Sequence, residues 1–195
     1  RSIDLIASGC FNTVRLAKIF RQEEAGDIVV NAHKINEGEL FEIGPSSRDF
    51  PFIRRTDANA IINALVTLVK VKLPAYTDCS PNDVQVLTPT RKGSLGVERL
   101  NTVLQQYLNP PSNSKVEKEI GSIIFREGDK VMQIKNNYQL EWEQRTDKGF
   151  LVDSGSGIFN GDMGIITKIN NLTNYIEVKF DDDRYVTCIA YIVQC

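Results

Sequence analysis

The clearest structural signal in the sequence is the run Y-I-E-V-K-F-D-D-D-R-Y-V-T-C at residues 175–188. Apolar and polar side chains alternate over residues 175–180, which is the pattern of a strand with one buried face. The aspartates at 181–183 predict a hairpin turn into a second strand over 184–188. Similar short runs occur at 120–125, 130–134 and 165–169. Five short strands within about 75 residues predict a small antiparallel β-barrel.

The sequence before residue 113 has a different pattern, in which expected helices alternate with expected strands. Gly9 and Gly38 suit helix ends, Asp57 suits a helix start, and Pro74 is expected beyond the end of the long third helix. The alternation implies an α/β layer with parallel strands. The expected helices cover 2–8, 25–38, 57–71 and 95–108, and the expected strands cover 13–16, 50–55 and 83–88.

Two further segments complete the predicted organisation. The run N-P-P-S-N-S at 109–114 ends the last helix and marks the boundary between the α/β part and the barrel. Residues 142–157 are polar and Gly-rich, so we expect a long exposed loop between two strands.

The composition excludes some classes of protein. The chain has 195 residues, is 42% hydrophobic and carries a formal net charge of −2. This balance excludes a generally basic nucleic-acid coat but allows a local basic groove. The longest apolar run, 61–71, is broken by Asn63, Thr67 and Lys70, so no membrane span is expected. Because the chain begins at Arg1 with neither an initiator Met nor a signal peptide, we expect a piece of a longer protein.

Several kinds of chemistry have no signature in the sequence. The four cysteines lie far apart and His33 is the only histidine, so neither a zinc site nor a nucleophile–base pair is expected, and the thiols are expected to be reduced. No G-x-x-x-x-G-K-[ST] phosphate-binding loop occurs. The three aspartates at 181–183 are interpreted as a solvated turn rather than a metal site. The chain alone is therefore predicted not to hydrolyse a nucleotide.

The first candidate functional segment is L-A-K-I-F-R-Q at residues 16–22. Arg21 would lie at the carboxyl end of a strand, where α/β proteins bind ligands, and its guanidinium suits phosphate oxygens. The alternative is a surface arginine that pairs with Glu23 or Glu24.

The second candidate segment is L-T-P-T-R-K-G-S-L-G at residues 87–96, a loop before a helix start. Helix amino ends bind anions through unpaired N–H groups, so a nucleic-acid phosphate would fit here. An ordinary loop with solvated charges explains the pattern equally well. The side chains that would contribute are Thr88, Thr90, Arg91, Lys92 and Ser94.

The third candidate segment combines F-N-G-D-M-G at 159–164 with F-R-E-G-D-K-V at 125–131. Both have the Gly-Asp turn that a small barrel needs at a tight corner. Small barrels also bind peptides or nucleic acids, so nearby side chains are candidates for base stacking and phosphate contact. A purely structural role for both turns is the alternative. The candidate contacts are Lys130, Lys135, Asn136, Asn137, Tyr138 and Trp142.

These segments, in this order, resemble the second motor domain of RecD/TraA-type helicases of superfamily 1. The resemblance is carried by I-F-R-Q (19–22), I-V-V-N-A-H-K-I-N-E-G (28–38), V-Q-V-L-T-P-T-R-K-G-S-L-G-V-E-R-L-N (84–101), F-R-E-G-D-K-V-M-Q-I-K-N-N-Y (125–138) and I-F-N-G-D-M-G-I-I (158–166). It implies an incomplete RecA-like motor domain over 1–113, an inserted Src-homology-type barrel over 114–188, and a truncated return to the motor domain over 189–195.

The resemblance also implies roles for the site residues. Arg21 matches the motif IV arginine that reaches the γ-phosphate of ATP, with Gln22 as a weaker nucleotide-binding neighbour. The T-P-T-R loop matches the region that contacts the tracked strand, and the barrel helps to enclose DNA. The family's phosphate-binding loop, its acidic Mg²⁺ residues and its last motifs have no match here. ATP and Mg²⁺ are thus expected in the intact parent and not in this fragment.

The resemblance predicts a part of an ATP-dependent DNA helicase that translocates on single-stranded DNA, in recombination or repair. The expected partners are single-stranded DNA, the first motor domain of the same chain and, for a parent of the exodeoxyribonuclease V alpha-chain type, nuclease subunits. A bacterial cytoplasmic location is expected, without a membrane. The alternative is a non-enzymatic nucleic-acid or protein-interaction module that binds through its barrel.

Overall fold

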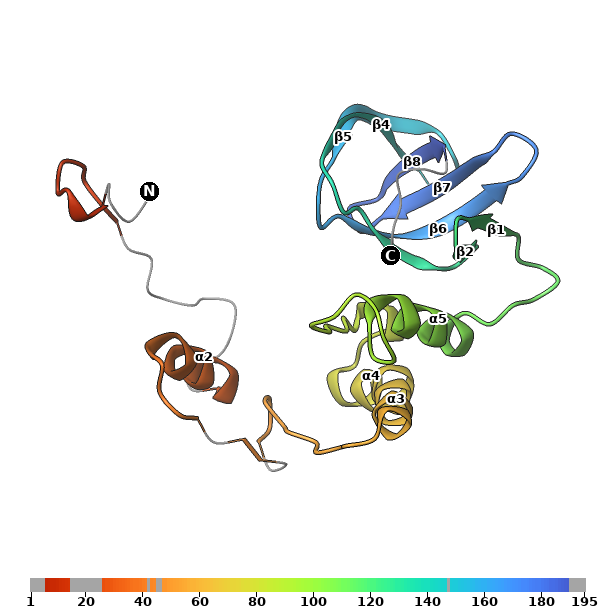
Figure 1. Cartoon of the computed structure of the whole chain (residues 1–195). Coiled ribbons are helices and arrows are strands. Elements are labelled where there is room, and N and C mark those ends of the chain that lie inside the picture. The colour runs from red at the N-terminus through yellow and green to blue at the C-terminus, as the bar shows by residue number, and fades with distance from the viewer. Residues whose placement is uncertain (1–5, 15–25, 42, 45–46, 147, 190–195) are drawn as a thin grey trace. The chain divides into compact units, whose positions relative to one another are not determined.

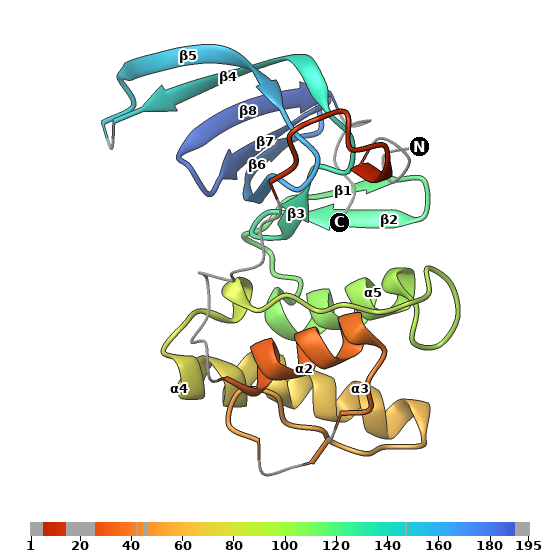
Figure 2. The same ribbon diagram turned by 90° about the vertical axis from the view of Figure 1, so that its left-hand side faces the viewer.

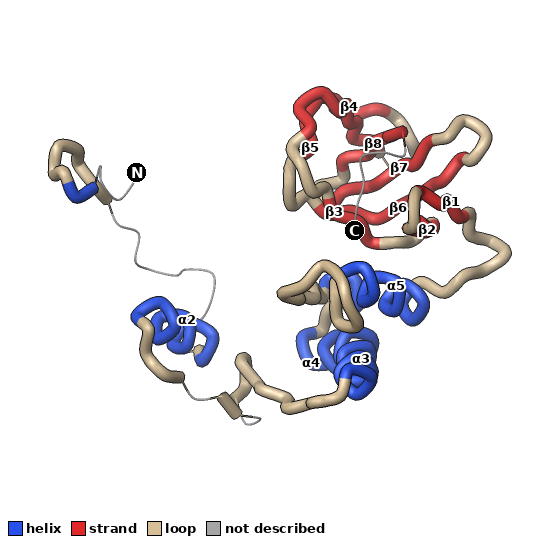
Figure 3. The backbone as a smooth tube through the Cα atoms, viewed as in Figure 1, coloured by secondary structure: helices blue, strands red, loops and turns tan. Residues whose placement is uncertain are grey.

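The computed structural model describes residues 6–14, 26–41, 43–44, 47–146 and 148–189 (Figure 1). The chain forms two compact units, Arg1–Arg55 and Thr56–Cys195. The predicted division near residue 113 lies inside the second unit, where helices give way to strands, as the two colours of Figure 3 show.

The helices are α2 (Asp27–Glu37), α3 (Ala58–Thr67), the π-helix η1 (Leu68–Lys72), α4 (Leu73–Thr77), the 3-10 helix η2 (Pro81–Asp83) and α5 (Val97–Leu108). The strands are β1 (Glu117–Ile120), β2 (Ile123–Arg126), β3 (Lys130–Met132), β4 (Asn137–Arg145), β5 (Leu151–Ile158), β6 (Met163–Asn170), β7 (Tyr175–Phe180) and β8 (Arg184–Ile189).

Helix α2 of the first unit confirms the helix predicted there. Its first N–H groups, of Asp27 and Ile28, donate to the carboxylate of Asp49 at 3.1 and 3.3 Å. A carboxylate at this end satisfies orphan donors and complements the helix dipole. The helix ends at Gly38, whose φ of 75° is the left-handed conformation expected of a C-terminal glycine. Glu23 and Glu24, the alternative partners of Arg21, lie outside the described residues.

The predicted strands before residue 113 are wrong wherever the structure describes them. Residues 50–55 and 84–88 form irregular chain, and residue 83 ends η2. A strand needs a partner for its N–H and C=O groups, and the described residues before 113 include no strand. The predicted run 13–16 is loop at 13–14 and otherwise lies outside the described residues. The expected parallel layer is therefore not formed in this part of the structure.

Helices α3, η1 and α4 follow one another without a break. The Asp57 side chain accepts a hydrogen bond from the Ala60 N–H at 2.8 Å, which confirms the predicted start. Pro74 lies inside the helix rather than beyond its end, so the predicted end is wrong. A π turn directly before Pro74 lets the helix continue through the proline. In this turn the Leu73 N–H donates to the Leu68 carbonyl, five residues back, and the next residue, Pro74, has no N–H to donate.

This helix, Ala58–Thr77, is 20 residues long and is apolar enough, by length and composition, to span a membrane. The polar breaks in the sequence led to the opposite expectation. Some of the polarity is masked, because the Thr67 and Thr77 hydroxyls donate to carbonyls four residues earlier, both at 2.8 Å. A single helix of this kind is weak evidence of a membrane protein, since core helices of soluble proteins share these properties.

The second half of the second unit is an antiparallel β-barrel, as predicted. Six strands pair in the order β3-β6-β7-β8-β4-β5, and β1 pairs with β2 in a separate hairpin (Figure 2). The core is formed by Phe125, Val131, Ile158, Ile166, Ile169, Ile176, Val178, Phe180, Val186 and Cys188. Strand β7 covers the predicted residues, with its alternate side chains buried, and residues 181–183 form the predicted turn.

Two predictions about the barrel need correction. Residues 120–125 are not one strand, because a turn at Gly121 divides them between β1 and β2. Residues 142–157 are not a loop, because most of them belong to the β4–β5 hairpin. The loop was predicted because the segment is rich in glycine, but Gly155 has a packing role in a regular strand. A Cβ at Gly155 would lie 2.6 Å from the Trp142 ring, so this glycine makes room for the aromatic side chain.

The buried thiol of Cys188 gives a direct test of the barrel core. Burial raises the pKa of Cys188 from 9.0 to about 11, whereas Cys10 is exposed. Since only the thiolate reacts, Cys188 should react with iodoacetamide at pH 8 at least about 10²-fold more slowly than Cys10, until urea unfolds the barrel. Mass spectrometry of timed samples would measure both rates, and equal rates in the native chain would contradict the packing.

Candidate nucleic-acid interface

A buried carboxylate connects helix α5 to the barrel. Asp129, 7% exposed, accepts hydrogen bonds from the Gln105 and Asn109 side chains at 2.6 and 2.7 Å and from the Arg126 N–H at 2.8 Å. Gln105 also donates to the Ile124 carbonyl at 2.7 Å. A buried carboxylate with three donors is well stabilised, and losing one donor is costly. We call these residues, Gln105, Asn109, Arg126 and Asp129, the α5–barrel clamp.

The remaining residues of the R-E-G-D turn strengthen the clamp. Arg126 is 5% exposed, pairs with Glu117 at 2.6 Å and donates to the Asn109 carbonyl. The Glu127 carboxylate accepts from the N–H groups of Val116 and Ile169 at 3.1 and 2.9 Å. The turn at 125–131 thus has the structural role that the sequence left open.

The loop before α5 is held by its own main chain. The Thr88 hydroxyl donates to the Leu95 carbonyl at 2.7 Å. The carbonyls of Thr90 and Arg91 accept from the N–H groups of Val97 and Glu98 at 3.0 and 3.3 Å. Two N–H groups at the start of α5 are therefore already used, so a phosphate here would be bound mainly by side chains.

The charged side chains of this loop face solvent. Arg91, Lys92 and Ser94 are exposed. Arg91 lies 3.4 Å from Glu98, and both side chains are more than half exposed, so solvent screens this pair strongly. Four of the predicted DNA-contacting residues, from 90 to 94, thus lie together in one short exposed loop.

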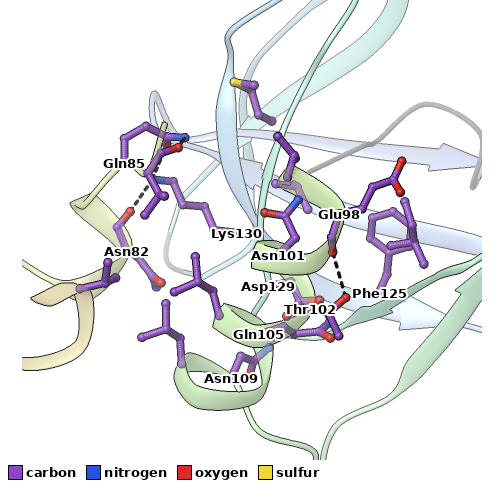
Figure 4. Close-up of a pocket in the computed structure, with 18 of the residues that line it drawn as sticks. Asn82, Gln85, Glu98, Asn101, Thr102, Gln105, Asn109, Phe125, Asp129 and Lys130 are labelled. Atoms are coloured by element: carbon purple, nitrogen blue, oxygen red, sulfur yellow. Dashed lines mark hydrogen bonds between the residues drawn. The ribbon is translucent and has the colours of Figure 1, made fainter. Parts of the chain in front are cut away.

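Lys130 does not lie with them. Its ammonium group donates to the Asn82 carbonyl at 2.6 Å and to the Gln85 side chain at 3.4 Å, which holds residues 82–85 against the barrel. It lines a cavity of about 660 Å³ between α5, residues 81–86 and strands β2 and β3. In Figure 4, Lys130 reaches toward Asn82 and Gln85, while Gln105, Asn109 and Asp129 gather elsewhere along the wall.

The other predicted barrel contacts differ in exposure. Lys135 and Tyr138 are exposed and Asn137 is half-buried. Asn136 is also exposed, and its amide donates to the Tyr138 hydroxyl at 3.3 Å. Trp142 is half-buried and packs against the core, so the structure gives it a packing role rather than a free stacking face.

Phe159 opens the third candidate segment, but the sequence analysis did not name it among the contact residues. Its ring lies 5.6 Å from the Tyr138 ring at an interplanar angle of 70°. The signal was present, since I-F-N-G-D contains an aromatic residue directly before a tight turn. Gln105 and Asn109 were missed as well, because each looks like an ordinary polar position in the helix.

The structure does not describe Arg21 or Gln22, so their predicted contact with a nucleotide stays a prediction. Among the described residues there is no group of three His, Cys, Asp or Glu side chains that could hold a metal ion.

Comparisons with known proteins agree on one family. A family model described as the SH3 domain of ATP-dependent RecD-like DNA helicases matches residues 100–180. The ATP-dependent RecD2 DNA helicase of Deinococcus radiodurans is 31% identical over 169 residues, which cover 87% of this chain and 19% of that protein. This chain therefore spans about a fifth of the relative's length. The matched residues 100–180 include most of α5 together with strands β1 to β7 of the barrel, which are the parts that the clamp joins.

The clamp can be tested through Asn109. Replacing Asn109 with Ala removes hydrogen bonds to the Asp129 carboxylate and the Glu127 carbonyl, so we expect a loss of about 2–3 kcal/mol in the free energy of unfolding. The exposed Asn113 is the matched control, and Asn113→Ala should change this free energy by less than about 0.5 kcal/mol. Urea denaturation followed by Trp142 fluorescence measures both; equal effects of the two substitutions would refute the clamp.

Proposed function

We propose that this chain, which belongs to the RecD-like family of DNA helicases, supplies a DNA-contacting part of an ATP-dependent helicase that translocates on single-stranded DNA. The observation that carries the proposal is the exposed basic loop at 90–94, on a helix that the clamp joins to the barrel. Phosphate contacts of this kind position a strand without reading its sequence. Recombination or repair is the process in which we expect the parent to act.

The loop would act as a unit with the barrel. Arg91 would offer its planar guanidinium to one phosphate and Lys92 a point charge to the next, with the Thr90 and Ser94 hydroxyls as further donors. Because α5 carries this loop and also donates to Asp129, a movement of the barrel would move the loop with it. This connection suits a motor that must keep hold of a strand while its domains move.

The intact protein would hydrolyse ATP, which the first motor domain would bind together with Mg²⁺. We propose that Arg21 then supplies positive charge at the γ-phosphate, with Gln22 beside it, and that the 195-residue chain is inactive alone. We also propose that the intact protein acts in the bacterial cytoplasm. It would be of the exodeoxyribonuclease V alpha-chain type and would work together with nuclease subunits.

The unpaired residues 84–88 and the cavity beside them fit this proposal. Leu87 is 88% exposed, and the cavity is bordered by apolar side chains of this segment and of α5. The exposed Leu87, beside the half-buried Val84 and Val86, suits a segment that pairs with a strand elsewhere in its protein. We propose that further strands of the motor domain pair with residues 84–88.

The basic loop can be tested with two double substitutions that remove the same charge. Arg91→Ala with Lys92→Ala should weaken binding of a thymidine oligonucleotide and reduce the salt slope by about one to two units. Arg54→Ala with Arg55→Ala, in another exposed segment, is the control and should change the slope by less. Fluorescence anisotropy over a salt series gives both slopes. Identical slopes would mean that the charges of the loop are merely solvated.

Arg21 is tested in the full-length protein that carries this segment. Arg21→Ala should lower the DNA-stimulated ATPase rate by about 10²-fold or more, since a positioned cation stabilises charge in phosphoryl transfer. The exposed Arg54 provides the control, and Arg54→Ala should leave the rate within about twofold of the unmodified protein. An unchanged rate in Arg21→Ala would remove this residue from the mechanism.

A further inference from the structure

We infer that the corner of the barrel formed by Tyr138 and Phe159 stacks an unpaired nucleobase of a DNA strand. This inference rests on the proposed function and adds to it a second kind of contact, made to a base rather than to a phosphate. Four neighbouring residues, Lys135, Asn136, Tyr138 and Phe159, make up what we call the aromatic corner.

The two rings form an exposed edge-to-face pair. Tyr138 is 67% exposed and Phe159 is 42% exposed, although both belong to a barrel with a well-packed core. Their centroids lie 5.6 Å apart with planes inclined at 70°. In this arrangement one ring packs against the other, and both residues keep a large exposed area. Exposed aromatic area is what a flat, hydrophobic ligand needs.

Phe159 is fixed in place by the turn that follows it. Its N–H donates to the Asp162 carboxylate at 3.0 Å, and the Arg184 guanidinium holds that carboxylate at 2.9 Å. Arg184 also donates to the Gly157 carbonyl at 3.0 Å, on the other side of Phe159. The main chain on both sides of the ring is therefore anchored to β8. A stacking surface that is already ordered loses little conformational entropy when a ligand binds to it.

Polar groups connect the two halves of the corner. The Asn136 side chain accepts from the Asn160 N–H at 2.9 Å and donates to the Tyr138 hydroxyl at 3.3 Å. The buried Gln133 donates to the Lys135 carbonyl at 2.7 Å, which fixes the main chain below the exposed lysine. Lys135 is exposed, lies three residues before Tyr138 and has no ion pair among the described residues, so the inference assigns it to a phosphate of the same strand.

The chemistry of the corner favours a nucleobase over a peptide. Aromatic rings with an adjacent cation are the usual elements of single-strand binding surfaces, where bases stack and the backbone is neutralised. Proline-rich peptides also pack on exposed aromatic rings of small barrels. The lysine carries the charge that complements a phosphate, and the chain belongs to a family of DNA helicases.

The experiment compares a thymidine oligonucleotide of about 12 nucleotides with an abasic strand of equal length, both labelled with fluorescein. Phe159→Ala and Tyr138→Ala, each in the whole chain, should weaken binding of the thymidine strand by about 5- to 150-fold and of the abasic strand by less than about twofold. Tyr138→Phe keeps the ring and should behave like the unmodified chain. The matched control is Phe150→Ala, which removes an exposed aromatic ring before β5, outside the corner.

Each other outcome overturns the inference. Unchanged thymidine binding in Phe159→Ala and Tyr138→Ala would mean that the rings carry no base, and equal losses on both strands would mean that they act through the fold. Displacement of the thymidine strand by a proline-rich peptide, from the unmodified chain but not from Phe159→Ala, would assign the corner to a peptide. In all three cases the proposed function would still hold if the salt dependence of oligonucleotide binding changed when Arg91 and Lys92 were replaced.

Discussion

The hydrogen bonds of the Asp129 carboxylate are the interaction on which the second unit depends. A carboxylate loses much of its hydration when it is buried, and only several well-placed donors compensate for that loss. Here the donors come from two different elements, the side chains of Gln105 and Asn109 on α5 and the main chain of Arg126 in the barrel. The helix and the barrel must therefore meet in one register for the carboxylate to be satisfied.

This constraint holds the two candidate binding features of the unit in fixed positions relative to each other. The basic loop at 90–94 is attached to the amino end of α5, whose later turns bond to Asp129. The aromatic corner is attached to the barrel through the Asp162–Arg184 pair. A strand that engaged both would meet one body rather than two hinged parts. The family model that matches 100–180 covers this same combination of helix and barrel.

The sequence predicted the parts of the fold that depend on local patterns. Alternation over 175–180 and the aspartate turn predicted β7, β8 and their hairpin, and Asp57 and Gly38 predicted helix ends. The predictions were wrong where long-range partners decide the outcome. Residues 83–88 are rich in β-branched side chains, but no strand pairs with them among the residues that the structure describes. The Gly-rich β5 is a strand because β4 pairs with it and Trp142 fills the space over Gly155.

The same distinction between local patterns and long-range partners applies to the residues of the candidate site. Exposed charges such as Arg91 and Lys92 could be named from the sequence because a loop before a helix predicts their exposure. The internal role of Lys130 could not, since its acceptors Asn82 and Gln85 lie more than 40 residues away in the chain. The pairing of Tyr138 with Phe159 also depends on a contact between distant residues that no local pattern contains.

The central claim, that the Asp129 carboxylate joins α5 to the barrel, is tested most directly by amide hydrogen exchange in Asp129→Ala. The claim predicts that the N–H groups of α5 exchange at least about tenfold faster in the variant, while those of β7, at the centre of the barrel, keep most of their protection. Exchange in α5 that is as slow as in the unmodified chain would show that the helix is held by other contacts and would contradict the claim.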